Sequence, residues 1–226
     1  MTYYLIGGGL GTLSGLMLYF LALHHLKVRS EFDKKDIYNK IKNRRYAFVW
    51  ILITVLMFEV ITYCELERID GTFYMCWHLI RVTIFAMFAI DVSAVDLMIR
   101  RIPNTALLAM IFLEIMELTV EVVVLGQDIV ETVFKALFGA AIAYAVFSFP
   151  SAFKLAIGVG DIKYSIVLGF MLGFFNFFEA MAVMAFASIL FWIYLKVFKK
   201  GNLKTAAPMG PFLSAGAMAA LLAPIF

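Results

Sequence analysis

Two aspartates stand in sequence contexts that could support acid–base chemistry at the edge of a membrane. Asp96 begins the motif Asp-x5-Ile-Pro-Asn, which ends at Asn104, and Asp161 completes the motif Gly-x-Gly-Asp, which starts at Gly158. A carboxylate near lipid is energetically costly, so two at the same expected depth on neighbouring helices indicate shared chemistry. Paired carboxyls can hydrolyse a peptide bond when one is ionised and activates water while the other donates a proton.

The residues around these aspartates fit such chemistry. Gly158 and Gly160 leave the backbone before Asp161 without side chains, so an extended substrate could approach it closely. Pro103 is expected to hold the residue before it extended and to start the next helix. The alternative for Asp161 is purely structural, because a carboxylate at that point could also cap the N-terminus of the following helix.

The composition places these motifs in a membrane protein. The chain has 226 residues, 64% of them hydrophobic, which is more apolar surface than a soluble protein of this length can bury. No basic, aromatic-rich domain indicates nucleic acid. The two cysteines are too few for a disulfide scaffold or a Cys-rich zinc site; Cys64 and Cys76, both expected near the outer membrane boundary, are either bridged or unpaired. The N-terminal apolar stretch lacks a preceding Lys or Arg and is expected to be a retained helix rather than a cleaved signal peptide.

The apolar segments predict an all-α, polytopic helix bundle of about eight transmembrane helices. No internal repeat divides the chain, so a single membrane domain is expected over 1–226. The sixth span is short, and its boundary with the seventh is placed at Asn176. The predicted spans are 4–26, 47–64, 74–95, 105–126, 130–150, 162–176, 178–198 and 208–225.

The distribution of Lys and Arg predicts the orientation of the bundle. Basic residues concentrate in alternate loops, whereas the loops between them are acidic or nearly uncharged, and basic loops normally stay in the cytoplasm. The N-terminus is therefore expected outside, and Asp96 and Asp161 at the cytoplasmic boundary of an inner membrane. The basic segments are 27–46, 96–104, the stretch containing Lys154, and 196–207.

The basic segment 27–46 is the only soluble stretch of any size. It is expected to be either a solvated cytoplasmic loop that fixes topology or a short amphipathic helix on the membrane surface. The apolar residues of that helix would be Phe32, Ile37, Ile41 and Tyr46.

Further acids lie within the predicted spans. Glu114, Glu117 and Glu121 share one face of the fourth span, because they recur at helical spacing. They could form a polar path or a stripe that recognises a substrate charge. The alternative is ion pairing between helices, for example with Lys135 or Arg81.

Three motifs together carry a family resemblance. Asp-x5-Ile-Pro-Asn from Asp96, Gly-x-Gly-Asp-x-Lys from Gly158, and Pro-x-Gly-Pro-Phe-Leu from Pro208 occur in this order. The combination resembles the type IV prepilin peptidase family, which includes bacterial leader peptidases and archaeal preflagellin peptidases. The resemblance covers roughly 90–217 and extends weakly to a glycine-rich stretch at 7–11.

The resemblance implies an aspartic endopeptidase with Asp96 and Asp161 as its catalytic pair. Its substrates would be type IV pilin-like precursors, cut on the cytoplasmic side of their hydrophobic helix, and its other partner the lipid bilayer. Lys163 would lie near the substrate or extend to the membrane interface. The residues expected to contact substrate are Gly158, Gly160, Lys163, Pro208, Gly210 and Pro211. No oligomeric state is implied.

The chain also departs from the family pattern. Many bacterial members carry two Cys-x-x-Cys pairs that bind zinc in the first cytoplasmic loop and also methylate the product, but 27–46 contains no cysteine. We therefore expect no metal, no cofactor and no N-methylation. Asp91 lies five residues before Asp96 but lacks a following Ile-Pro-Asn at the family spacing, so it is the weaker catalytic candidate.

The competing function is a proton-coupled membrane transporter that uses the same buried acids. Transporters often show inverted repeats and helices broken at the membrane midplane, and the sequence displays neither. Presenilin-like proteases are a further alternative, but the chain lacks their Tyr-Asp and Pro-Ala-Leu motifs.

Overall fold

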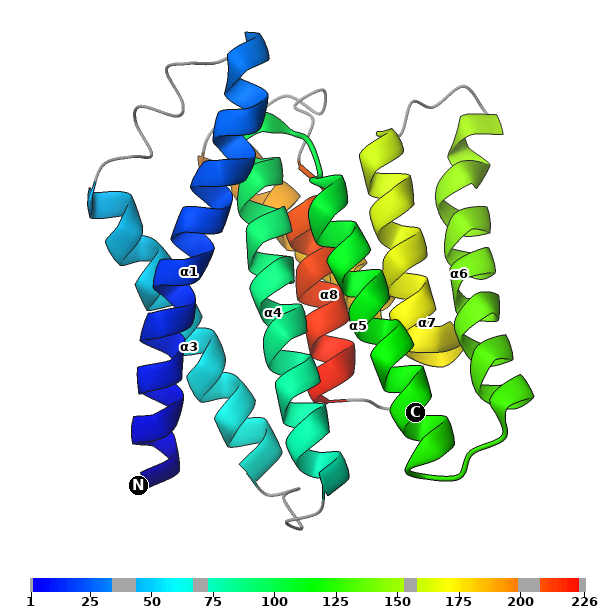
Figure 1. The fold of residues 1–226 in the computed structure, drawn as a ribbon. Coiled ribbons are helices and arrows are strands. Elements are labelled where there is room, and N and C mark those ends of the chain that lie inside the picture. Colours follow the sequence, from blue (N-terminus) through cyan, green and yellow to red (C-terminus); the bar gives the residue numbers. More distant parts are fainter. Residues whose placement is uncertain (1, 34–43, 67–72, 153–157, 199–207, 224–226) are drawn as a thin grey trace. The chain divides into compact units, whose positions relative to one another are not determined.

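The computed structural model describes residues 2–33, 44–66, 73–152, 158–198 and 208–223, and within them the chain is helical, with no strand (Figure 1). The expected all-α class is therefore confirmed for the described residues. The helices are α1 (Thr2–Asp33), α3 (Arg44–Leu66), α4 (Phe73–Ile99), α5 (Asn104–Val123), α6 (Ile129–Ala152), α7 (Val159–Phe198) and α8 (Gly210–Leu222).

The chain falls into two compact units, Met1–Ile99 and Arg100–Phe226. The first unit contains α1, α3 and α4, and the second contains α5 to α8. Each unit is described by itself. A single membrane domain over 1–226 stays a prediction.

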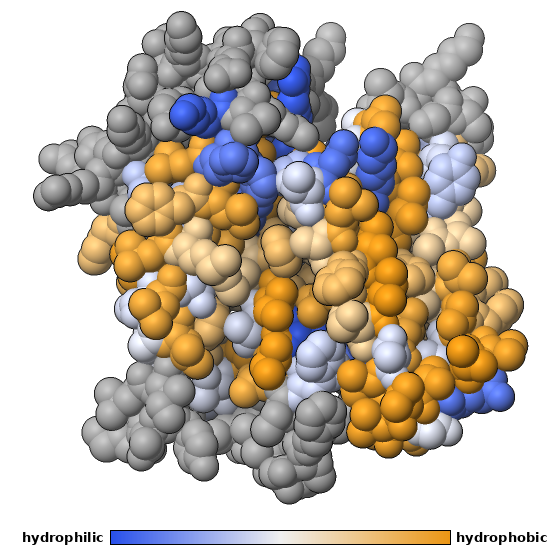
Figure 2. All heavy atoms as spheres, viewed as in Figure 1, coloured by the Kyte–Doolittle hydropathy of each residue, from blue (hydrophilic) through white to orange (hydrophobic). Residues whose placement is uncertain are grey.

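Three helical stretches among the described residues are long and apolar enough to cross a membrane: Trp77–Ile99, Ile129–Pro150 and Val159–Val197. Two shorter apolar stretches, Phe48–Cys64 and Gly210–Leu222, accompany them. Figure 2 shows hydrophobic side chains along the helices of the second unit. Large ones with exposed surface there include Leu108, Phe112, Phe134 and Phe149. These features support a helical membrane protein, whereas eight crossings and an outside N-terminus stay predictions.

In the first unit, α1 and α3 pack through glycines. A Cβ atom built on Gly11 would lie 2.9 Å from the Cα of Val55, and one on Gly15 would lie 2.7 Å from the Cα of Ile51. These glycines are four residues apart and so share one helix face. Small residues at this spacing let two helix backbones approach closely, which is the usual way helices associate in lipid.

In the second unit, α7 contains the predicted sixth and seventh spans within one element. Its break lies at Gly173, where φ is 68° and ψ is −173°, and not at Asn176 as the sequence predicted. That backbone conformation is essentially restricted to glycine, which explains why the chain turns there. We call residues 159–172 the first arm of α7 and residues 174–198 its second arm; Figure 1 shows the chain reversing between them.

Glycines also set the packing of the two arms. A Cβ on Gly139 of α6 would lie 2.8 Å from the Cα of Gly173, and one on Gly169 would lie 2.6 Å from the Cβ of Ala143. On the second arm, a Cβ on Gly216 of α8 would meet the backbone of Ala180. The first arm is therefore held closely against α6 and the second arm against α8.

Helix ends near the basic segment differ from the prediction. The first span was expected to end at residue 26 and the second to begin at 47, but α1 continues to Asp33 and α3 begins at Arg44. Periodicity marks where apolar residues stop, whereas a helix can continue beyond the lipid while its side chains remain helix-compatible. The centre of the basic segment, 34–43, and with it Ile37 and Ile41 of the proposed surface helix, lies outside the described residues.

Candidate functional site

Asp96 lies in the last turn of α4, three residues before the helix ends at Ile99. Its side chain is buried, with the residue 4% exposed, although the neighbouring Leu97 is 61% exposed. Asp96 belongs to the first unit.

Residues 100–104 of the first motif belong to the second unit. Arg100 has a φ of 53°, a left-handed conformation that ends a helix. Pro103 is extended, with φ −73° and ψ 122°, and is the N-cap of α5. Its carbonyl accepts a hydrogen bond from the backbone N–H of Leu107 over 3.3 Å. Pro103 therefore starts the next helix, as the sequence predicted.

Asp161 lies in the first turn of α7, two residues after the helix begins at Val159. It is not the N-cap residue, but the first turn of a helix also favours a carboxylate, because its N–H groups lack intrahelical partners. A Cβ built on Gly158 would lie only 2.8 Å from Oδ2 of Asp161. In this orientation the carboxyl group of Asp161 therefore occupies the space that a side chain at 158 would enter, a relation that the sequence analysis did not give.

Gly160 links the two aspartate motifs within the second unit. A Cβ built there would lie 3.5 Å from the Cβ of Ile102, which is ordinary van der Waals contact. Ile102 is buried, at 6% exposed, and belongs to the Ile-Pro-Asn part of the first motif. The connection between α4 and α5 therefore packs on the turn that carries Asp161.

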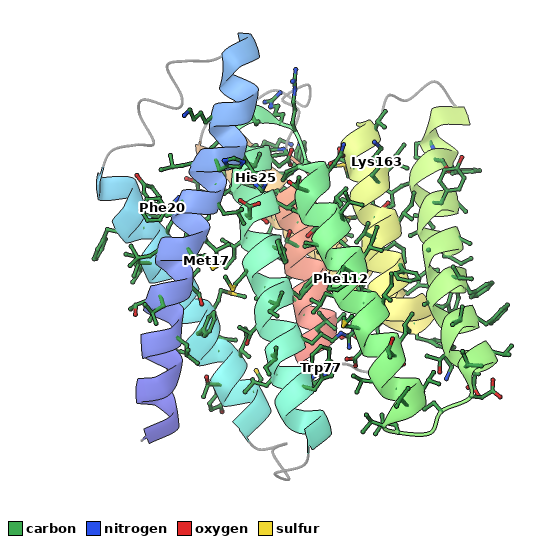
Figure 3. All side chains as sticks on the ribbon, viewed as in Figure 1. Met17, Phe20, His25, Trp77, Phe112 and Lys163 are labelled. Carbon is green, nitrogen blue, oxygen red and sulfur yellow. The ribbon has the colours of Figure 1, made fainter. Side chains whose placement is uncertain are left out.

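The other predicted substrate contacts are divided between α7 and α8. Lys163 is exposed on the first arm of α7 (Figure 3). Met209 is the N-cap of α8, which begins at the buried Gly210, and Pro211 lies in the first turn. Pro208 precedes this turn and is half-buried. The Pro-x-Gly-Pro segment is thus a helix N-terminus, and contact of these residues with substrate stays a prediction.

A buried tyrosine close to Asp161 was missed from the sequence. Tyr164 is fully buried on the first arm of α7, and its hydroxyl lies 2.7 Å from Oγ of Ser214 on α8. Either hydroxyl can donate this hydrogen bond. A tyrosine within an apolar helix signals such a bond in general, because a buried phenol normally has a partner, but it does not name the partner.

Asp91, the weaker catalytic candidate, is already engaged. It is 0% exposed, and its Oδ2 lies 2.8 Å from Nδ1 of His25 on α1. Its Oδ1 is buried without a hydrogen-bond partner. Figure 3 places His25 toward the end of α1 beside α4, within the same unit. From the sequence, a partner for Asp91 could be expected only because a buried charge is costly when it is unpaired. That expectation does not name His25, which the sequence analysis missed.

Further acids are buried away from the two aspartate motifs. Glu114 and Glu117 lie in α5, at 3% and 1% exposed. Lys135, one of the partners suggested for them, pairs with Glu131 over 2.7 Å, and ion pairing of Glu114 and Glu117 between helices stays a prediction. Glu179, at the start of the predicted seventh span, is buried at 7% exposed in the second arm of α7.

Cys64 is a free, half-buried cysteine in α3. Of the two alternatives for the cysteines, bridged or unpaired, the structure shows Cys64 unpaired. Among the described residues, no three His, Cys, Asp or Glu side chains come together as a metal site.

Comparison with known proteins places these motifs in a family. A model of the type IV leader peptidase family matches residues 83–197, which include both Asp96 and Asp161. Comparisons with curated proteins and with solved structures gave no match.

Proposed function

Because the chain belongs to the type IV leader peptidase family, it is a peptidase of that general type, and we propose that it works as an aspartic endopeptidase. Asp96 and Asp161 are the proposed catalytic pair. The proposed substrates are type IV pilin-like precursors, cut at the cytoplasmic boundary of an inner membrane with the N-terminus of the enzyme outside.

The observation that carries this proposal is the turn around Asp161. Its carboxyl occupies the space over Gly158, and Gly160 packs on Ile102 of the motif that follows Asp96. The glycine leaves this orientation of the carboxyl open, and together with the packing of Gly160 on Ile102 this supports a role for Asp161 beyond capping the helix.

The positions of the two aspartates at helix ends indicate which carboxyl is the base and which is the acid. Asp161 is in the first turn of α7, where the helix dipole favours a negative charge. Asp96 is buried in the last turn of α4, where both burial and the opposite end of the dipole disfavour one. In the proposed reaction Asp161 is therefore the ionised base and Asp96 the protonated acid.

The reaction follows from these roles. Asp161 takes a proton from water as the water oxygen attacks the carbonyl carbon of the peptide, and Asp96 gives its proton to the carbonyl oxygen. When the tetrahedral intermediate collapses, the C–N bond breaks and the proton held by Asp161 passes to the departing amine. The hydroxyl proton of the intermediate returns to Asp96, so both carboxyls regain their starting states.

The remaining proposed substrate contacts lie on helix starts. Lys163 is exposed one turn of helix from Gly160, and the N-terminus of α8 brings together Pro208, Gly210 and Pro211. We propose that these residues border the bound precursor. We do not propose N-methylation of the product, because the sequence 27–46 lacks the cysteines associated with it.

The test is cleavage of a pilin-like precursor by purified wild type, Asp96→Asn and Asp161→Asn enzyme in detergent, read as the mass of the product. Asp128→Asn is the matched control. Oδ1 of Asp128 accepts the backbone N–H of Val130 at 2.7 Å and of Glu131 at 3.0 Å, and an Asn oxygen can do the same.

We expect each catalytic variant to lose at least about a thousandfold in rate, the scale seen when an acid–base residue is removed, while Asp128→Asn keeps wild-type activity. Cleavage that persists in one variant would remove that aspartate from catalysis. A wild-type enzyme that cuts no leader would overturn the proposed substrate class.

A further inference from the structure

The strongest unassigned feature near the proposed site is the hydrogen bond between Tyr164 and Ser214. It connects the first arm of α7 to α8 through two residues that are 50 positions apart in the sequence. Tyr164 is among the largest fully buried side chains of the protein, and Ser214 is 5% exposed. The two hydroxyls are therefore largely shielded from water.

Tyr164 is placed to control the turn that carries Asp161. The two residues are three apart on one helix, so their Cβ atoms are neighbours, about 5–6 Å apart. A long side chain on a helix leans toward the N-terminus and covers the preceding turn. From these rules we expect the ring of Tyr164 to cover the Asp161 turn, and its hydroxyl reaches Ser214.

The α8 end of this bond is itself held in register. Gly216, two residues after Ser214, packs against the backbone of Ala180 on the second arm of α7. Phe212, two residues before Ser214, has its ring centroid 5.3 Å from that of Phe191, also on the second arm. Ser214 is thus a fixed point, and the bond ties the Asp161 turn to it.

A second buried hydroxyl provides a contrast. Ser165 is 0% exposed, but its Oγ donates to the carbonyl of Ile162 over 2.8 Å, within the same helix. Removing that hydroxyl costs a buried hydrogen bond without disconnecting α7 from α8. Ser165 is therefore a matched control for the bond that joins the two helices.

We propose that Tyr164 and Ser214 are a positioning pair for Asp161, and this inference rests on the proposed peptidase function. The bond holds the first turn of α7 at one distance from the start of α8. The carboxyl of Asp161, which belongs to this turn, is thereby kept where it can take a proton from water. Neither hydroxyl takes part in proton transfer to the substrate.

The kinetic test compares kcat and KM of Tyr164→Phe, Ser214→Ala and the double variant with those of wild type and Ser165→Ala. We expect kcat of each single variant to fall about ten- to a hundredfold, the scale of a small misplacement of a reacting group, with KM nearly unchanged. The double variant should be no slower than the slower single variant, because one bond is lost in each case. Ser214→Thr, which keeps the hydroxyl, should restore most of kcat.

A distance measurement tests the same bond without relying on activity. Nitroxide labels on cysteines at Val159, 69% exposed, and at the exposed Ala215 report the spacing of the α7 start and α8. The labels require a background with Cys64→Ser and Cys76→Ser. The distance distribution should broaden in Tyr164→Phe and Ser214→Ala but not in Ser165→Ala.

The two readouts separate the possible failures. An unchanged distance distribution, or a loss of kcat in Ser165→Ala equal to that in Ser214→Ala, would overturn the positioning role. Multiplying effects in the double variant would also overturn it. If the wild type cleaves no precursor while the distribution broadens as expected, the proposed function fails and the bond still sets the position of the Asp161 turn.

Discussion

The two units of this protein hold their helices together in related but chemically different ways. Both bring helix backbones close through glycines, at Gly15 in the first unit and at Gly139 in the second. The polar connection differs. The first unit buries a histidine–carboxylate pair, His25 with Asp91, whereas the second buries two neutral hydroxyls, Tyr164 with Ser214.

The difference shows how each unit can fix a helix that carries a proposed catalytic aspartate. A buried charge requires its partner, so the link from α1 to α4 is strong only while both members are present. A neutral hydroxyl pair is worth less but places no second charge beside Asp161. Asp91 of the first pair lies on α4 five residues before Asp96, and Tyr164 of the second pair lies on α7 three residues after Asp161.

The largest predicted effect comes from breaking the charged pair. His25→Ala leaves Asp91 buried without its partner, which should lower the free energy of unfolding by about 3–5 kcal/mol. The measurement is denaturation in mixed micelles. Adding Asp91→Asn to the variant should recover much of the loss, since it removes the uncompensated carboxylate.

The control for this prediction is the neighbouring His24→Ala, because His24 is exposed. It should change the unfolding midpoint very little. A His25→Ala protein as stable as wild type would mean that the first unit does not depend on its charged pair, and the contrast between the units would disappear.

The next largest effect, a loss of stability from adding a side chain at a packed glycine, should be equal in the two units. Gly15→Ala and Gly139→Ala each place a Cβ against a neighbouring backbone, so each should destabilise by about 1–3 kcal/mol, the usual penalty for overpacking. Gly9→Ala is the matched control, because a Cβ there meets nothing within 4 Å. Thermal unfolding that is altered by only one of the first two variants would show that the units differ in backbone packing as well.

Gly173→Ala isolates the break in α7, which has no counterpart in the described helices of the first unit. The nearest atom to an added Cβ is the carbonyl oxygen of Lys135 at 3.8 Å, so crowding is not the cause of the expected loss. The positive φ should still destabilise the variant by about 1–2 kcal/mol. Equal melting temperatures of variant and wild type would contradict the assigned backbone strain.

The smallest effect is expected where the first unit passes into the second. Arg100→Gly relieves a positive φ but makes the unfolded chain more flexible. These terms nearly cancel, so we expect a gain of no more than about 0.5 kcal/mol. Chemical denaturation of purified protein measures it, and a clear loss of stability would indicate that the Arg100 side chain contributes more than its backbone conformation.

Most of the fold could be predicted from the sequence, because helices that are compatible with lipid can be recognised by their length and apolar content. Helix identity followed from this rule for every described element. The position of the break in α7 did not, because Gly173 is one of several glycines in an apolar stretch and only its backbone angles distinguish it. The sequence analysis placed the break at Asn176 because it is the most polar residue nearby, and that position was wrong.

The candidate site was predicted less completely. Short motifs marked Asp96 and Asp161 as the catalytic candidates, and the catalytic role of both stays a proposal. The partners His25 and Ser214 could not be predicted, because they come from helices far away in the sequence. Long-range pairing depends on how the helices pack, and local patterns carry no information about it.

The break at Gly173 has a consequence for the surrounding lipid. At 1.5 Å per residue the first arm of α7 is about 21 Å long, shorter than the roughly 30 Å hydrocarbon core of a bilayer. Thinning of the bilayer around it is one way in which an inserted arm of that length is accommodated. Such thinning would lower the barrier that keeps water from Asp161, so hydrolysis would depend on membrane thickness as well as on the residues of the enzyme.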